Sequence, residues 1–181
     1  MCPQESLKCP YTGNDCSTKT DLCDQLIPTN KISCIERMLG TCVCREHNMK
    51  YELKNEDRLC IKKLHIDNCL ITGSNSTRCD YVVFVCSSKS CCLVELKGSN
   101  IDHACDQILN TTILINNILN KCNKIYARVV ASRMPTPNIR SSHKTKLDNF
   151  CRSHRGNLKI QVRTLQENAS TLWRWEYFLD K

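Results

Sequence analysis

Residues 79–98 read CDYVVFVCSSKSCCLVELKG, and this stretch decides the fold. Two runs that are mostly β-branched, aromatic or otherwise apolar, 81–85 and 91–96, flank the polar residues 87–90. Strand-forming runs on either side of a short polar stretch are typical of a β-hairpin. We therefore expect a central hairpin, with the rest of the chain packed around it.

The register of this hairpin places charged residues together. A turn centred between Ser88 and Lys89 puts Asp80 opposite Lys97. Because side chains alternate between the two faces of a strand, Glu95 shares a face with this pair. Two neighbouring carboxylates repel each other unless a cation lies between them, and oxygen ligands suit Mg²⁺ or Mn²⁺. The pattern predicts a metal site at this end of the hairpin.

These residues resemble the PD-(D/E)XK, or restriction-endonuclease-like, nuclease superfamily. That family has an acidic residue on one central strand, Glu/Asp-x-Lys on the next, and then a helix. Here the matching residues are Asp80, Glu95 and Lys97, with a helix expected from about residue 100. Some branches add a glutamine on that helix, where this chain has Gln107. The resemblance extends loosely over residues 58–165.

The resemblance implies an α/β fold, with a restriction-endonuclease-like mixed β-sheet flanked by helices. It also implies an endonuclease-like, Mg²⁺-dependent hydrolase that cuts phosphodiester bonds of nucleic acid, DNA rather than RNA. In this scheme Asp80, Glu95 and the Leu96 carbonyl hold Mg²⁺ or Mn²⁺. Lys97 orients the attacking water or helps deprotonate it, and Gln107 is an auxiliary contact.

The tripeptide Glu-x-Lys carries little information alone, because Glu52-Leu53-Lys54 repeats it without a preceding apolar strand or a following helix. The alternative for Asp80, Glu95 and Lys97 is a sheet-edge surface with a salt bridge. The corresponding alternative function is a non-catalytic nucleic-acid-binding or metal-stabilised protein with a nuclease-like fold.

Charge is unevenly distributed along the 181 residues. Residues 1–120 hold 13 Lys and Arg against 14 Asp and Glu, a net −1, whereas residues 121–181 hold 13 against 4, a net +9. A basic segment beside a nuclease-like centre indicates a polyanion-binding surface. The candidate nucleic-acid contacts are Arg133, Arg140, Lys144, Lys146 and Arg152.

Sixteen cysteines are far above ordinary usage. Residues 1–28 are expected to form a cysteine-rich segment preceding a nuclease-like domain over 29–181. Four thiolates of that segment would hold Zn²⁺ or an iron–sulfur cluster, or else stay unligated: Cys2, Cys9, Cys16 and Cys23. A second possible set is Cys34, Cys42, Cys44 and His47.

The first residues lack the basic start and apolar run of a signal peptide, and no run of 18 apolar residues occurs. These features favour a soluble, cytoplasmic protein with no membrane partner. A secreted, disulfide-stapled binding domain is the remaining alternative, and it requires an oxidising compartment.

The flanking sequence predicts further elements. A helix is expected over 31–39, carrying Glu36 as a possible auxiliary acid. The other expected elements are a small hairpin at 41–45 and 49–53, a strand at 59–72, a helix at 101–121, a strand at 124–131, a helix from Ser141 or Ser142 to 151, and a strand at 158–163. A capped helix after Asn168 would pack Leu172 on the core, and Trp173 and Tyr177 would either join the core or serve a homodimer contact or base stacking.

Overall fold

The computed structural model describes residues 29–73, 77–133 and 141–173. The strands are β1 (Ile35–Met38), β2 (Cys42–Glu46), β3 (Met49–Lys54), β4 (Ile61–His65), β5 (Tyr81–Val85), β6 (Ser90–Lys97), β7 (Lys124–Ala131), β8 (Leu158–Val162) and β9 (Thr164–Asn168). The helices are α1 (Ile101–Leu114), α2 (Asn116–Leu119), α3 (Ser142–Ser153) and α4 (Ala169–Trp173), with 3₁₀ turns at Thr29–Cys34 and Cys86–Ser88.

Two sheets form the framework. The larger has six strands in the order β1-β4-β5-β6-β7-β8, antiparallel from β1 to β6 and parallel from β6 to β8. The smaller has the order β2-β3-β9, with β2 antiparallel and β9 parallel to β3. The α/β class and the mixed sheet are therefore confirmed. The small sheet was predicted only as the β2–β3 hairpin.

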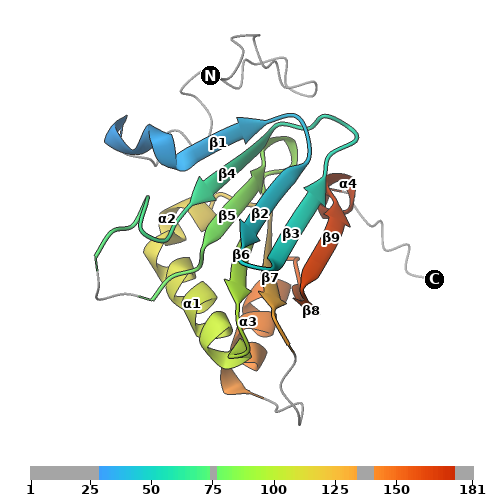
Figure 1. Ribbon diagram of the computed structural model, residues 1–181. Coiled ribbons are helices and arrows are strands. Elements are labelled where there is room, and N and C mark those ends of the chain that lie inside the picture. The colour runs from blue at the N-terminus through green and yellow to red at the C-terminus, as the bar shows by residue number, and fades with distance from the viewer. Residues whose placement is uncertain (1–28, 74–76, 134–140, 174–181) are drawn as a thin grey trace, which may run out of the picture.

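The two faces of the large sheet have different covers (Figure 1). Helices α1, α2 and α3 lie on one face, and the small sheet lies over the other. Because both faces of β5, β6 and β7 are buried, these strands are apolar for most of their length rather than strictly alternating. This explains the valine-rich runs around the central hairpin.

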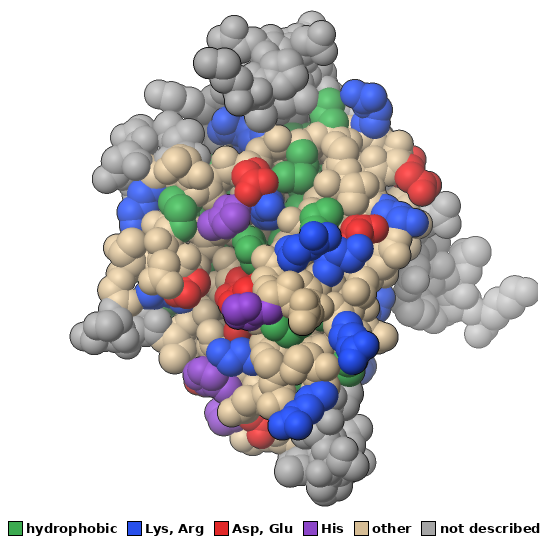
Figure 2. Space-filling view, in the orientation of Figure 1, with side chains coloured by type: hydrophobic (Ala, Val, Ile, Leu, Met, Phe, Trp, Pro, Cys, Tyr) green, Lys and Arg blue, Asp and Glu red, His purple; other side chains and the backbone are tan. Residues whose placement is uncertain are grey.

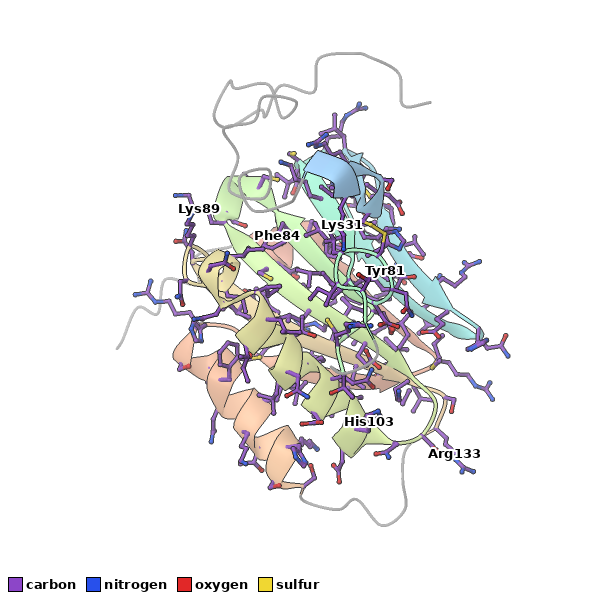
Figure 3. All side chains as sticks on the ribbon, turned by 90° about the vertical axis from the view of Figure 1, so that its left-hand side faces the viewer. Lys31, Tyr81, Phe84, Lys89, His103 and Arg133 are labelled. Carbon is purple, nitrogen blue, oxygen red and sulfur yellow. A yellow bond between two sulfur atoms is a disulfide. The ribbon has the colours of Figure 1, made fainter. Side chains whose placement is uncertain are left out.

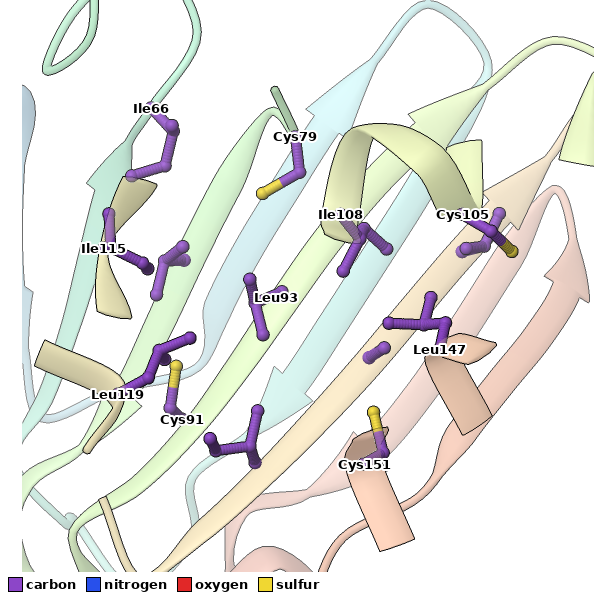
Figure 4. Packing of buried hydrophobic residues seen from close by; sticks show 14 of the residues in the cluster. Ile66, Cys79, Cys91, Leu93, Cys105, Ile108, Ile115, Leu119, Leu147 and Cys151 are labelled. Atoms are coloured by element: carbon purple, nitrogen blue, oxygen red, sulfur yellow. The ribbon is translucent and has the colours of Figure 1, made fainter. Parts of the chain in front are cut away.

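The core on the helical face consists of strand residues that meet the inner sides of the helices (Figure 4). Leu93 of β6 packs with Ile108 of α1, Leu119 of α2 and Leu147 of α3. Four cysteines join this cluster as small apolar side chains: Cys79, Cys91, Cys105 and Cys151.

The central hairpin forms with a different register from the one predicted. The turn comprises Cys86–Ser88 and Lys89, whose φ is 50°, and Val85 pairs with Ser90. The register differs from the prediction by two residues. Since side chains alternate with a period of two, this difference leaves every side chain on its predicted face.

The helix predicted over 31–39 is wrong. This segment forms a 3₁₀ turn and the edge strand β1, which pairs with β4 so that Glu36 lies beside Lys63. A disulfide joins Cys34 to Cys69 just before β1. Contacts with residues about 30 positions away in the sequence thus override a local helical spacing.

Three other elements differ from expectation. Strand β4 ends at His65, and the chain then folds back through Asn68, whose φ is 55°. The helix predicted over 101–121 is interrupted at Ile115, where φ and ψ leave the helical region and α2 begins. Strand β9 was not predicted from the sequence, because its alternation rests on Leu165 and Glu167 alone. The strand at 124–131 and the Ser141 cap of α3 are confirmed.

The cysteines are used in more than one way. Cys2, Cys9, Cys16 and Cys23 lie outside the described residues, so their metal site stays a prediction. Cys34 is held in its disulfide and is not available to the second possible metal set. Other thiols, such as that of Cys92, are reduced and buried. Within the described residues, no helix is long and apolar enough to cross a membrane.

A buried ion pair joins the two sheets. Arg128 of β7 is fully buried, and its Nε and Nη2 atoms donate to both carboxylate oxygens of Glu167 on β9, at 2.5 and 3.1 Å. Its Nη1 donates to the Asn157 carbonyl at 2.9 Å. Lys159 adds a bond of 2.6 Å to Glu167. Burial opposes ionisation of Glu167, but these cations outweigh it and lower its pKa.

Replacing Glu167 with Gln should lower the free energy of unfolding by about 3–5 kcal/mol, because Arg128 would keep a buried charge without a counter-ion. The matched control is Asp148→Asn, which removes an exposed ion pair with Arg152 on α3 and should change stability by less than about 0.5 kcal/mol. Urea unfolding at pH 7 measures both. If both variants lose the same free energy of unfolding, the buried ion pair stabilises the protein no more than an exposed one does.

Candidate functional site at the start of the central hairpin

The carboxylates of Asp80 and Glu95 each accept a hydrogen bond from a backbone amide across the hairpin. The carboxylate of Asp80 accepts a hydrogen bond from the Leu96 amide at 2.7 Å, through Oδ2. The carboxylate of Glu95 accepts one from the Asp80 amide at 3.2 Å, through Oε2. The observed register places Asp80 directly opposite Glu95, because Tyr81 pairs with Val94. The predicted acidic pair is therefore brought together, more closely than the predicted register implied.

This exchange replaces one step of the β ladder. If β5 extended by two more residues, Cys79 would pair with Leu96 and exchange both backbone bonds with it. Instead, the side chain of Asp80 takes the Leu96 amide, and the Cys79 amide donates to Thr111 Oγ1 at 2.8 Å. The Leu96 carbonyl consequently does not accept a bond from the Cys79 amide, as it would in a continued ladder.

Lys97 completes the predicted trio. Its Nζ lies 3.8 Å from Oε1 of Glu95, which is the carboxylate oxygen that the Asp80 amide does not bind. The side chain of Glu95 is 1% exposed, whereas that of Lys97 is 30% exposed. The Lys97 side chain therefore lies between the buried Glu95 carboxylate and the solvent, at the end of β6.

Both carboxyl groups hold protons strongly. Burial raises the pKa of Asp80 to about 7, against the opposing effect of the Leu96 amide. Burial and the charge of Asp80 raise the pKa of Glu95 to about 9. Glu46, at the end of β2, adds negative charge that raises the pKa of both groups further. Near neutral pH at least one of the two carboxyl groups is therefore protonated, unless a bound cation offsets their negative charge.

Helix α1 fixes the segment that carries Asp80. Gln107 donates through Nε2 to the Arg78 carbonyl at 2.9 Å, while Thr111, one turn later, accepts the Cys79 amide. Asn110 donates to the Thr77 hydroxyl at 2.6 Å. Gln107 therefore lies next to the site, as predicted, but its amide nitrogen contacts the backbone before Asp80.

A second clamp holds the same segment from the other side. The Arg78 guanidinium donates to Asp67 and to the Gly73 carbonyl, each at 2.7 Å. The Ile66 amide donates to the Asp80 carbonyl at 2.9 Å. Arg78 and Thr111 were not predicted as positioning residues, because their partners depend on how α1 and the segment after β4 pack around Asp80.

Glu36 is not brought to the acidic pair. It lies on β1, three strands from β6 in the sheet order, and binds Lys63 at 2.9 Å and His65 at 2.5 Å. Burial opposes its ionisation, but these two partners outweigh that effect and lower its pKa.

The predicted nucleic-acid contacts lie on two elements. Arg133 is exposed just beyond β7, and three others lie on α3: Lys144 half-buried, Lys146 exposed, and Arg152 exposed but paired with Asp148 at 2.8 Å. Arg140 lies outside the described residues. Figure 3 places Arg133 at the same end of the molecule as His103 of α1, opposite Lys89 in the hairpin turn.

The oxygen atoms at this site suit a hard divalent cation. The residues that the structure describes include no group of three His, Cys, Asp or Glu side chains able to hold a metal ion. Two carboxylates and the Leu96 carbonyl are present instead, and Mg²⁺ usually takes one or two carboxylates and completes its shell with water and substrate phosphates. The donor set therefore fits Mg²⁺ or Mn²⁺ better than Zn²⁺.

Comparison of the chain with protein-family models, curated proteins and solved structures finds no match.

The raised pKa values predict how stability depends on pH when no metal is present. In the unfolded chain both carboxyl groups ionise near pH 4, whereas the folded protein retains their protons up to about pH 7 and 9. The unfolded state therefore binds fewer protons, and stability should fall as pH rises from about 5 to 9. Urea unfolding in a chelating buffer measures this slope.

The control is the double variant Asp80→Asn with Glu95→Gln, which keeps the shapes but removes both titrations. Its slope between pH 5 and 9 should be shallower by up to about 1.4 kcal/mol per pH unit for each proton. If the wild-type protein and the double variant have the same slope, the two carboxyl groups are not perturbed as described.

Proposed function

We propose that this chain is a metal-dependent nuclease that hydrolyses phosphodiester bonds of nucleic acid, DNA rather than RNA. The observation that carries the proposal is the acidic pair, in which Asp80, directly before β5, lies opposite Glu95 of β6, with Lys97 two residues beyond Glu95 on the same face. Its resemblance to the PD-(D/E)XK pattern supplies the reaction class, and we propose a restriction-endonuclease-like fold on the same basis.

The arrangement of oxygen atoms supports a metal-binding role. Asp80 and Glu95 each use one oxygen for a backbone amide, which fixes the carboxylates and leaves Oδ1 of Asp80 and Oε1 of Glu95 for a cation. The Leu96 carbonyl would be the third protein ligand. Bound Mg²⁺ or Mn²⁺ would act as a Lewis acid on the scissile phosphate. It would also stabilise the ionised carboxylates against the burial that raises both pKa values.

Lys97 would act on the attacking water. Its ammonium lies beside Glu95 and extends into solvent, so it is placed to orient water or to stabilise negative charge that develops on the phosphate. Gln107 would act indirectly, because its contact with the Arg78 carbonyl positions the segment that carries Asp80. Arg133, Lys144 and Lys146 would contact the nucleic-acid backbone.

We propose that the protein is cytoplasmic. Reduced, buried thiols such as those of Cys42 and Cys105 fit this proposal, although the Cys34–Cys69 bond is of a kind more common in oxidising compartments. A homodimer contact through the C-terminal aromatic residues stays a prediction, because residues 174–181 lie outside the described part.

One observation favours a second candidate, a non-catalytic nucleic-acid-binding protein with this fold. Asp80 and Glu95 already stabilise the start of the hairpin by binding backbone amides, and their raised pKa values allow them to remain protonated. A structural role of this kind needs no metal. Metal-dependent cleavage is the measurement that separates the two functions.

Asp80→Asn, Glu95→Gln and Lys97→Met should each reduce Mg²⁺- or Mn²⁺-dependent cleavage by about 100-fold or more, since each removes a metal ligand or a charge that stabilises the transition state. The assay uses single-stranded DNA, duplex DNA and RNA. The matched control is Glu52→Gln, which alters the second Glu-Leu-Lys tripeptide, on β3, and should leave cleavage unchanged. Unimpaired cleavage by any two site variants would overturn the proposal.

Metal affinity should depend on pH in a defined direction. A divalent cation competes with the protons on Asp80 and Glu95, so calorimetric Mn²⁺ affinity should increase from pH 6 to pH 9. The Asp80→Asn and Glu95→Gln double variant should bind Mn²⁺ weakly at every pH. Tight, pH-independent binding by that variant would place the metal elsewhere.

A further inference from the structure

Three parallel strands, β6, β7 and β8, have their carboxyl ends on the side of the large sheet where the acidic pair lies. Lys97, the last residue of β6, pairs with Ala131 of β7, and Ala131 pairs with Val162 of β8. The carboxyl ends of β6, β7 and β8 therefore form one continuous row. In open α/β sheets, ligands commonly bind at the carboxyl ends of parallel strands.

This row carries cations. Lys97 ends β6, Arg133 follows β7 by two residues, and Arg163 follows β8 directly. Arg133 and Arg163 are exposed, and neither side chain makes a hydrogen bond or ion pair with any residue in the described part of the chain. Acidic groups near this end include Asp80, Glu95, Glu46 and Asp102 in the first turn of α1, and Lys97 faces Glu95.

The backbone of Arg163 is held firmly. Its amide donates to the Ala131 carbonyl and its carbonyl accepts from the Lys50 amide, both at 2.8 Å. Its φ is 63°, in the left-handed region that side-chain-bearing residues seldom adopt. The two bonds join the end of β7 to the start of β3 through this residue, so the direction in which its side chain leaves the sheet is fixed. Figure 2 shows Lys and Arg side chains on the face formed by the small sheet.

We propose that Lys97, Arg133 and Arg163 form a phosphate-binding rim, along which one DNA strand runs from the Asp80–Glu95 pair across β7 to β8. Two strand spacings separate β6 from β8, about 10 Å, which corresponds to about three base steps of a duplex along its axis. One arginine guanidinium can donate two parallel hydrogen bonds to the oxygens of one phosphate. Each of the two arginines of the rim is therefore suited to bind a backbone phosphate. This inference rests on the proposed function and adds Arg163 to its contacts.

The chain contains a matched control for Arg163. Arg155 is also exposed, has a φ of 56°, and its side chain makes no hydrogen bond or ion pair with the described residues, but it precedes β8 where Arg163 follows it. The two arginines thus lie at opposite ends of a five-residue strand about 16 Å long. Arg163→Asn and Arg155→Asn remove the same charge from the same backbone conformation, and Asn tolerates that conformation.

The test measures binding of a fluorescent 12-base-pair DNA duplex by anisotropy, in chelator so that no cleavage occurs, from 50 to 200 mM salt. Arg163→Asn and Arg133→Gln should each weaken binding by about five- to tenfold and reduce the log–log salt slope by about 1. Arg155→Asn should change neither quantity, and Arg163→Lys should retain the slope.

Equal losses for Arg163→Asn and Arg155→Asn, or no loss for Arg163→Asn, would overturn the rim. An RNA duplex of the same sequence bound about tenfold more tightly than the DNA would overturn the choice of DNA. The rim and the proposed function fail separately. Rim-dependent binding without metal-dependent cleavage supports the rim and removes the nuclease, whereas cleavage that needs Asp80 but is insensitive to Arg163 does the reverse.

Discussion

The buried guanidinium of Arg128 is the constraint on which the two-sheet arrangement depends. An arginine in the middle of an apolar strand has to find an anion, and here the anion comes from β9 of the other sheet. The pair therefore determines which strand completes the small sheet and which face of β7 it covers. Tyr51 of β3 reaches the same carboxylate at 3.4 Å and Lys159 of β8 also binds it, so four strands meet at one charged group within an otherwise apolar layer.

The candidate site depends on a different kind of constraint, the register of the central hairpin. The carboxylates of Asp80 and Glu95 each bind a backbone amide across the hairpin, so their geometry follows from the pairing of β5 with β6. Helix α1 and the Asp67–Arg78 ion pair then fix the approach to Asp80 from both sides. Because these contacts fix the positions of both carboxylates, the site favours a ligand that needs its binding groups at fixed positions.

The sequence predicts the centre of the fold better than its periphery. The apolar runs at 81–85 and 91–96 on either side of a polar stretch predict the hairpin, and a register difference of two residues preserves its faces. Strand β1 was predicted as a helix, because its pairing with β4 and the Cys34–Cys69 bond depend on distant residues. The buried Arg128 signals that an acidic partner exists, but the sequence does not identify Glu167 as that partner. The same limit applies to the contacts of Gln107 and Thr111, which depend on where α1 packs.

The pairing of β3 with β9 has a consequence for synthesis of the chain on the ribosome. Tyr51 and Glu167 are separated by 116 positions, so the β2–β3 hairpin emerges long before its third strand. During that interval the free edge of β3 presents unpaired amides and carbonyls, and open strand edges readily pair with other chains. The charged residues Lys50, Glu52 and Lys54 alternate along this edge strand, a pattern that discourages such association until β9 arrives.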